Sequence, residues 1–164
     1  MPQPFRAAVL GLALVAALGL GACSNDKDLA DASAFGAGAA TPGSAQDFVV
    51  NIGDRVFFES DSTDLTPTAT ATLDKQAAWL QRYPRYTFII EGHADERGTR
   101  EYNFSLGARR AQAVNDYLAT RGITGNRMRT VSYGKERPVA VCNDISCWSQ
   151  NRRAVIVLDR GAGA

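Results

Sequence analysis

The stretch EGHADERGTREYNFSLGARRAQAVNDYL (91–118) decides how this chain is organised. It follows YTFII (86–90), a continuous apolar run that is typical of a buried strand. Apolar residues then recur at helical spacing, and we expect a helix from about Arg100 to Thr120, closed by Gly122. A polar loop therefore lies between a strand and a helix start, where free backbone N–H groups favour anions.

Shorter patterns on either side predict the remaining elements. Thr66-Pro67 marks a helix start, because Thr caps and Pro suits the first helical position, and Pro84 ends that helix. The expected inward stripes are Ala69, Leu73, Ala77 and Leu80 in this helix, and Phe104, Ala108, Ala111, Val114 and Leu118 in the later one. Apolar runs predict a strand or hairpin over FVVN and RVFF (48–58), and strands at 128–133 and 153–158. The order β-α-β-α-β-β predicts an α/β (α+β) two-layer sandwich, with two helices on one face of a mixed sheet.

Composition limits what the chain can be. It has 164 residues, of which 45% are hydrophobic and 21% charged, which suits one folded domain. A two-domain enzyme, a disordered chain and a polytopic membrane protein are excluded. A net charge of +1 gives no reason to expect nucleic acid as a partner. One His and three Cys leave little material for a metal site, so we expect neither a metal nor a cofactor.

The N-terminal segment reads as an export signal. An apolar run from Ala7 to Leu20 follows a single Arg and is too short to span a bilayer comfortably, although a short signal anchor is the alternative. Leu20-Gly21-Ala22-Cys23 resembles a bacterial lipobox, which implies diacylglyceryl attachment to Cys23, cleavage before it and acylation of its new amino group. Ser24, where Asp would retain such proteins at the inner membrane, implies the outer membrane. The expected layout is a signal peptide (1–22), acylated Cys and flexible linker (23–47), folded domain (48–160) and short tail (161–164).

Helical spacing brings several polar residues of the deciding stretch together. Asn103 and Arg110 are seven positions apart and share a helix face with Leu106, while Asp95 lies in the preceding loop. Arg offers a bidentate fork to a carboxylate and Asp accepts from an ammonium, so a free amino acid group is a reasonable ligand. The alternative is that Asp95 caps the helix or pairs with Arg97, and that Arg110 is a solvated charge.

Several separated motifs resemble one family. GHADERGTREYN, LGARRAQAV, VSYGKERPV and SQNRRAVIV, in that order, resemble the OmpA-like peptidoglycan-binding domain over about residues 48–160. The resemblance implies that the ligand is the diaminopimelate of the peptidoglycan stem peptide. By motif alignment Asp95 takes the ammonium and Arg110 the carboxylate, Asn103 and Leu106 line the site, and Arg97 lies close to the ligand.

The first loop of the domain departs from the family at one position. FFESDSTDLTP (57–67) resembles the family pattern FxFDxxxxxL, which places Asp61 at a second ligand-contacting position. Ser60 stands where the family usually has Phe just before that Asp. One apolar contact with the ligand is therefore expected to be missing.

The resemblance implies a non-enzymatic tether. Acyl chains on Cys23 would hold the chain in the cell outer membrane with its domain facing the periplasm, where it binds peptidoglycan. Lipoproteins of this family work in the Tol system with the periplasmic propeller protein TolB, in envelope integrity and cell division. The alternatives are an OmpA-like lipoprotein outside the Tol system and, in a different class, a peptidoglycan hydrolase. Hydrolysis is disfavoured because Glu91, Asp95 and Glu96 form no interpretable acid pair and no G-x-S-x-G elbow occurs.

Five further residues need an assignment. Cys142 and Cys147 lie in the expected loop before the last strand, and in an oxidising periplasm a disulfide is the simplest interpretation. A two-thiol metal site would lack its other ligands. His93 is expected to make local hydrogen bonds, and we expect no catalytic residue. Arg152 and Arg153 are expected to support the site through salt bridges.

Overall fold

The computed structural model describes residues 40–159. The predicted signal peptide, the acylation site Cys23, most of the linker and the 161–164 tail lie outside the described residues. Within the part that the structure describes, no helix is both long enough and apolar enough to cross a membrane.

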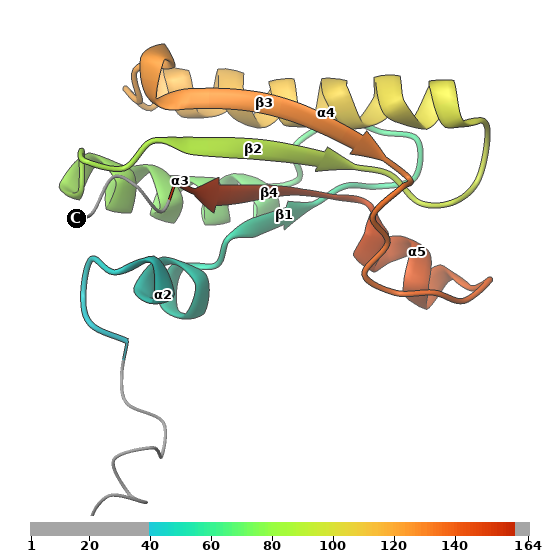
Figure 1. Ribbon diagram of the computed structural model, residues 1–164, viewed down its shortest axis with the longest axis horizontal. Coiled ribbons are helices and arrows are strands. Elements are labelled where there is room, and N and C mark those ends of the chain that lie inside the picture. The colour runs from blue at the N-terminus through green and yellow to red at the C-terminus, as the bar shows by residue number, and fades with distance from the viewer. Residues whose placement is uncertain (1–39, 160–164) are drawn as a thin grey trace, which may run out of the picture. The chain divides into compact units, whose positions relative to one another are not determined.

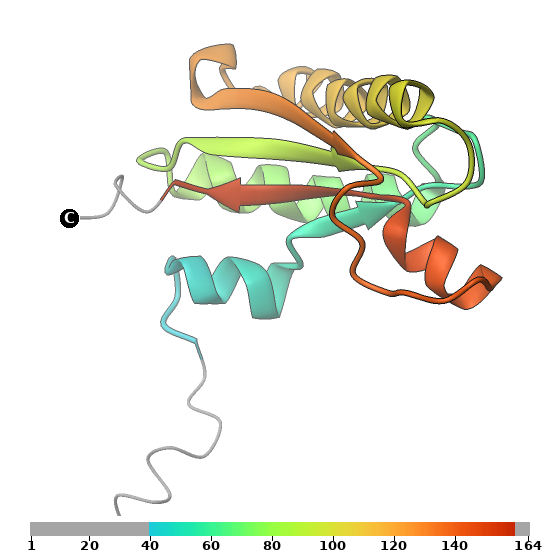
Figure 2. The ribbon, with the colours of Figure 1, turned by 45° about the vertical axis from the view of Figure 1, so that its right-hand side comes forward.

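A four-stranded mixed sheet forms one layer of the domain, in the order β1 (Arg55–Phe57), β4 (Arg153–Leu158), β2 (Phe88–His93) and β3 (Met128–Gly134). β4 runs antiparallel to both of its neighbours, while β2 and β3 are parallel. The long helices α3 (Pro67–Arg82) and α4 (Arg100–Thr120) pack behind this sheet (Figure 1; Figure 2). The two-layer α+β fold predicted from the sequence is therefore confirmed.

Helix α3 begins and packs as its sequence predicts. The Thr66 hydroxyl accepts a hydrogen bond from the Ala69 N–H, and Pro67 occupies the first helical position. The whole expected stripe is buried: Ala69, Leu73, Ala77 and Leu80. These side chains meet Phe88 and Ile90 of β2 and Ile156 of β4 in the main core.

Of the strand or hairpin predicted over 48–58, only the RVFF part is confirmed, as β1, whereas the segment FVVNI is helical. It forms a π-helical turn, η1 (Phe48–Ile52), directly after the short helix α2 (Ala45–Asp47). The buried Asp47 carboxylate accepts hydrogen bonds from the Trp79 indole at 2.8 Å and from the Asn51 amide at 2.8 Å. Phe48 packs against the Trp79 ring, with 4.9 Å between the centroids. These tertiary contacts with α3 outweigh the strand preference of the valines.

The packed part of the chain includes residues ahead of Phe48, the boundary expected from the sequence. The Gly43 carbonyl accepts hydrogen bonds from Arg85 at 2.8 Å and from the Tyr86 hydroxyl at 2.9 Å. Gly43 itself has a positive φ of 78°, and a Cβ there would lie 2.4 Å from the Tyr83 ring. The small and polar residues ahead of Phe48 gave no sign that this segment packs on the domain, because the contacts come from α3 and the loop after it.

Helix α4 presents a different inner face from the expected one. Ala111, Val114 and Leu118 are buried as predicted, but Phe104 is 56% exposed and Ala108 is also exposed. The cause is Gly107, whose lack of a side chain lets the helix axis approach β2 closely. The inner face therefore follows Asn103, Gly107, Arg110 and Val114 rather than the apolar side chains alone.

Three smaller differences concern the second half of the chain. A short helix, α5 (Ile145–Asn151), replaces the loop expected around Cys147, and Asp144 caps it by accepting from the Ser146 N–H at 2.9 Å. Strand β2 continues to His93, three residues beyond the apolar run. A 3-10 turn, η2 (Gly125–Arg127), leads into β3.

Candidate functional site

A cavity of about 250 Å³ lies where the β1–α3 loop, the β2–α4 loop and the first turns of α4 meet. Its lining consists of Ser60, Asp61, Asp95, Arg97, Gly98, Tyr102, Asn103 and Leu106. All the predicted site residues except Arg110 are in this set, although they come from segments more than 30 positions apart. The fold therefore brings five of the six predicted site residues to one cavity, and Arg110 lies outside its lining.

Asp95 is the anionic centre of the cavity. It is only 7% exposed and accepts from Arg97 through Nε at 3.0 Å, Nη2 at 2.7 Å and the backbone N–H at 3.1 Å. Arg152 adds a longer contact of 3.5 Å. Burial would raise the pKa of Asp95, but the hydrogen bonds and charge of Arg97 outweigh it, so the pKa lies below its ordinary value. The carboxylate is ionised at neutral pH, and the pairing with Arg97 that the sequence left open is present.

Arg110 is fully buried rather than a solvated charge. Its Nε donates to the Ser62 carbonyl at 2.9 Å, and its two Nη atoms donate to the carbonyls of His93 at 2.9 Å and Glu59 at 3.0 Å. Burial, and then the charge of Arg152, lower the pKa of Arg110 to about 10, so it remains a cation at neutral pH. A guanidinium has five N–H donors, so among the described residues one N–H on each Nη is left for a further acceptor.

The start of α4 is tied to the loop that carries Asp95. Thr99 caps the helix by accepting from the Tyr102 N–H at 3.2 Å. The buried Asn103 amide donates to the Arg97 carbonyl at 2.6 Å, and Leu106 is buried on the same face of the helix. Asn103 therefore holds the loop in shape, and Leu106 supplies an apolar wall.

Two hydrogen bonds cross the mouth of the cavity. Tyr102 of α4 donates its hydroxyl proton to the carboxylate of Asp61, which has a φ of 55°. This hydrogen bond raises the pKa of Tyr102. Arg97 donates to the Ser60 hydroxyl at 2.8 Å. Tyr102 was not among the predicted site residues, although it lies in the motif EYN beside Asn103, and no partner was predicted for Ser60.

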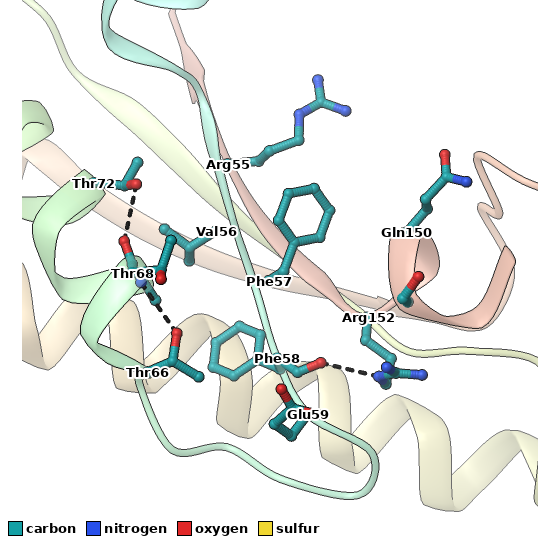
Figure 3. Close-up of a pocket in the computed structure, with 12 residues that line it drawn as sticks. Arg55, Val56, Phe57, Phe58, Glu59, Thr66, Thr68, Thr72, Gln150 and Arg152 are labelled. Atoms are coloured by element: carbon teal, nitrogen blue, oxygen red, sulfur yellow. Dashed lines mark hydrogen bonds between the residues drawn. The ribbon is translucent and has the colours of Figure 1, made fainter. Parts of the chain in front are cut away.

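Arg152 connects this cavity to a larger one, of about 540 Å³, which lies between β1, the start of α3 and the end of α5. Figure 3 shows its guanidinium beside the Phe58 carbonyl, to which Nε donates at 2.9 Å. The same guanidinium reaches Asp95 in the smaller cavity. The salt bridge expected of Arg152 is therefore present, whereas Arg153 donates to backbone carbonyls, including that of Arg137 at 3.1 Å.

His93 does not make the local hydrogen bonds expected of it. It is 1% exposed, stacks on Tyr133 with 5.6 Å between the centroids, and neither ring nitrogen has a hydrogen-bond partner in the described structure. Its Nε2 lies 3.5 Å from Glu91. Burial, and then the charges of Arg153 and Arg137, lower the pKa of His93 to about 4, so the ring is neutral at pH 7. No cluster of three or more metal-ligating side chains occurs within residues 40–159.

Cys142 and Cys147 form a disulfide, with 5.7 Å between their Cα atoms. It closes the segment that leads into α5. The same helix carries Trp148, whose indole lies 4.3 Å from the Arg97 guanidinium. No role was predicted for Trp148, because no local pattern connects it to Arg97, 51 positions earlier.

Curated relatives cover nearly the whole chain. "Peptidoglycan-associated lipoprotein" of Rhizobium meliloti is 65% identical over 93% of this chain and 88% of its own length. The protein of the same name from Brucella melitensis is 58% identical over 98% of this chain and 97% of its own length.

Solved structures share the fold. The crystal structure of the peptidoglycan-associated lipoprotein from Burkholderia pseudomallei has a TM-score of 0.63 and 42% identity, covering 65% of this chain and 90% of that one. The C-terminal domain of Helicobacter pylori MotB has a TM-score of 0.61 at 24% identity, covering 66% of this chain and 88% of that one, and supports the fold alone. The family model described as OmpA family matches residues 57–152, which include both loops of the cavity, and the chain therefore belongs to the OmpA family.

Proposed function

We propose that this chain is an outer-membrane lipoprotein that binds peptidoglycan non-covalently through the diaminopimelate of the stem peptide. The observation that carries the proposal is the cavity around Asp95, in which a buried, ionised carboxylate lies among Asn103, Leu106 and Arg97. The names of the relatives support the same ligand class. The proposal is for a binding site, not for an enzyme.

Each end of the diaminopimelate side chain meets a group of opposite charge. The ammonium donates to Asp95 and takes the place of the longest of its four present contacts, the 3.5 Å one from Arg152. Its carboxylate accepts from the remaining N–H groups of Arg110, which lies one helical turn beyond Leu106. Leu106 packs against the methylenes between the two ends. Asp61 and Tyr102 also line the cavity, and both are exposed.

Anchoring and partners complete the proposal. Acyl chains on Cys23 hold the chain in the outer membrane, and the segment that follows lets the domain reach the cell wall in the periplasm. Each contact with the wall is modest, but many copies on one sacculus provide avidity. A TolB-like periplasmic propeller is the expected protein partner in the Tol–Pal system, which supports envelope integrity and cell division. The lipobox and the relatives' names support this assignment.

Sedimentation with purified sacculi tests the proposal. The lipidated full chain, purified in mild detergent, is mixed with diaminopimelate-type or lysine-type sacculi, and released muropeptides are assayed in parallel. We expect sedimentation with diaminopimelate-type sacculi only, and no released product. Asp95→Asn removes the charge with little change of shape and should reduce sedimentation at least tenfold, whereas Arg109→Lys, on the exposed side of α4, should bind normally. Equal binding by Asp95→Asn would refute the site, and released muropeptides would show an enzyme.

A further inference from the structure

Arg97 is held on three sides, although its side chain is 43% exposed. One edge of the guanidinium binds Asp95, and Nη2 also donates to Ser60 at 2.8 Å. One face lies over the Trp148 ring, 4.3 Å from its centroid. An exposed arginine normally samples many rotamers, so these contacts together restrict it to one position beside Asp95.

Trp148 contacts two successive residues of the loop that carries Asp95. Its ring lies against Arg97, and its indole N–H donates to the carboxylate of Glu96. Glu96 and Arg97 immediately follow Asp95, so a single side chain from α5 fixes the segment on the carboxyl side of the binding residue. Trp148 itself does not line the cavity.

The position of α5 depends on very little apolar packing. The helix has seven residues, and the apolar side chains around its start face solvent: Val141 is 87% exposed and Ile145 is 57% exposed. A helix this short has little stability of its own. Near the start of the helix, the disulfide joins Cys147 to Cys142 in the preceding segment. At the end of the helix, the Asn151 side-chain amide donates to the Ala140 carbonyl at 2.8 Å. These cross-connections take the place of a hydrophobic contact.

We infer that Trp148 is a positioning residue for the ligand site, and that the Cys142–Cys147 disulfide keeps it in place. Trp148 holds Arg97, and Arg97 in turn fixes the orientation of the Asp95 carboxylate. A carboxylate that is already oriented loses less conformational freedom when it binds an ammonium. This inference rests on the proposed function, since it assigns a further residue to the same site.

Two measurements on the lipidated full chain test the inference. One is sedimentation with diaminopimelate-type sacculi. The other is hydrogen exchange of the Arg97 backbone amide, which donates to Asp95 at 3.1 Å; this measurement requires no ligand. Trp148→Leu removes the aromatic face, whereas Trp148→Phe keeps one. The double variant Cys142→Ser/Cys147→Ser removes the disulfide. Ile145→Ala, an exposed change on the same helix, is the matched control.

We expect Trp148→Leu and the double variant to exchange the Arg97 amide faster and to bind sacculi about two- to fivefold more weakly, as the loss of an exposed cation–π contact implies. Trp148→Phe and Ile145→Ala should stay within about twofold of the parent chain. Unchanged Arg97 exchange in both Trp148→Leu and the double variant would overturn the inference, even if binding fell. A third outcome is possible, in which the Arg97 amide exchanges faster in the variants but the parent chain itself does not bind sacculi. That result would support the positioning role of Trp148 and overturn the proposed function.

Discussion

Gly107 of α4 lies directly against Gly92 of β2, backbone on backbone. A Cβ built on Gly92 would lie 1.8 Å from the Gly107 carbonyl oxygen, and a Cβ on Gly107 would lie 2.8 Å from the Gly92 oxygen. Asn103 and Arg110 stand one turn to either side of Gly107 on the same inner face. The close approach of the two glycines therefore determines how near these polar side chains lie to the end of β2.

Gly92→Ala is expected to destabilise the domain and to push α4 away from the sheet. The methyl group meets backbone, which cannot move aside as a side chain could, so we expect a loss of roughly 3 kcal/mol in the free energy of unfolding. Urea denaturation measures the loss. Gly125→Ala is the control, because nothing lies within 4 Å of its added Cβ, and it should change stability by about 0.5 kcal/mol or less. Similar stabilities for the two variants would contradict the close approach.

Arg110→Lys is expected to lower stability even though it keeps the positive charge. Lysine cannot reproduce a planar fork to three carbonyls, so at least some of the oxygens of Glu59, Ser62 and His93 lose their buried donors. We expect a loss of roughly 3 kcal/mol in the free energy of unfolding. The neighbouring Arg109→Lys, at an exposed position, should be nearly neutral. If the two variants unfold at the same urea concentration, the buried bonds of Arg110 contribute nothing to stability.

Stability should fall between pH 6.5 and pH 4 because His93 is buried as the neutral form. Its pKa is about 4 in the fold against an ordinary value of 6.5 in the unfolded chain, so in this window the unfolded chain binds more protons than the folded one. The contribution of His93 is therefore fully present above pH 6.5 and is lost as the pH falls through 4, by up to roughly 3 kcal/mol. His93→Phe keeps an aromatic ring on Tyr133 but cannot titrate. The free energy of unfolding of the parent chain minus that of His93→Phe, measured from pH 8 to pH 4, should become lower within this window. A difference that stays constant would show that His93 does not titrate there.

Asp61 combines a side-chain contact with a left-handed backbone, and two substitutions separate them. Asp61→Gly removes the carboxylate that accepts from Tyr102 but suits a φ of 55°, whereas Asp61→Ala removes the carboxylate and strains the backbone. We expect Asp61→Ala to be about 1 kcal/mol less stable than Asp61→Gly in thermal unfolding. Both should bind sacculi equally once folded, because both lack the same carboxylate. Equal stability would show that the backbone there is not under strain.

Local patterns predicted the elements with strong periodicity or clear end signals. Thr66-Pro67 and the stripe from Ala69 to Leu80 identified α3 correctly, because the caps and the apolar spacing lie within the helix itself. The strand predicted for FVVN was wrong, because the helical form of this segment depends on packing of Phe48 against Trp79, 31 positions later. Phe104 failed because burial in α4 follows the glycine contact with β2 rather than hydrophobicity.

In the candidate site, too, some features followed from local spacing and others only from tertiary contacts. Helical spacing put Asn103, Leu106 and Arg110 on one face, and the structure places all three there, buried. Gly92, inside β2, is a signal in the sequence for the contact with α4, because glycine inside a strand often marks a close backbone approach. Trp148 had no such signal, since its contact with Arg97 spans half the domain.

By itself the sequence determined the two long helices, the polar loop that carries Asp95 and the order of helices and strands along the chain. Those features depend on periodicity, caps and turn residues, which act over a few positions. Only the tertiary structure decided that Arg110 is buried on the carbonyls of Ser62 and Glu59, which are 48 and 51 positions away. Burial and orientation of a charged side chain are set by whichever distant segment packs against it, and no spacing along the chain encodes that choice.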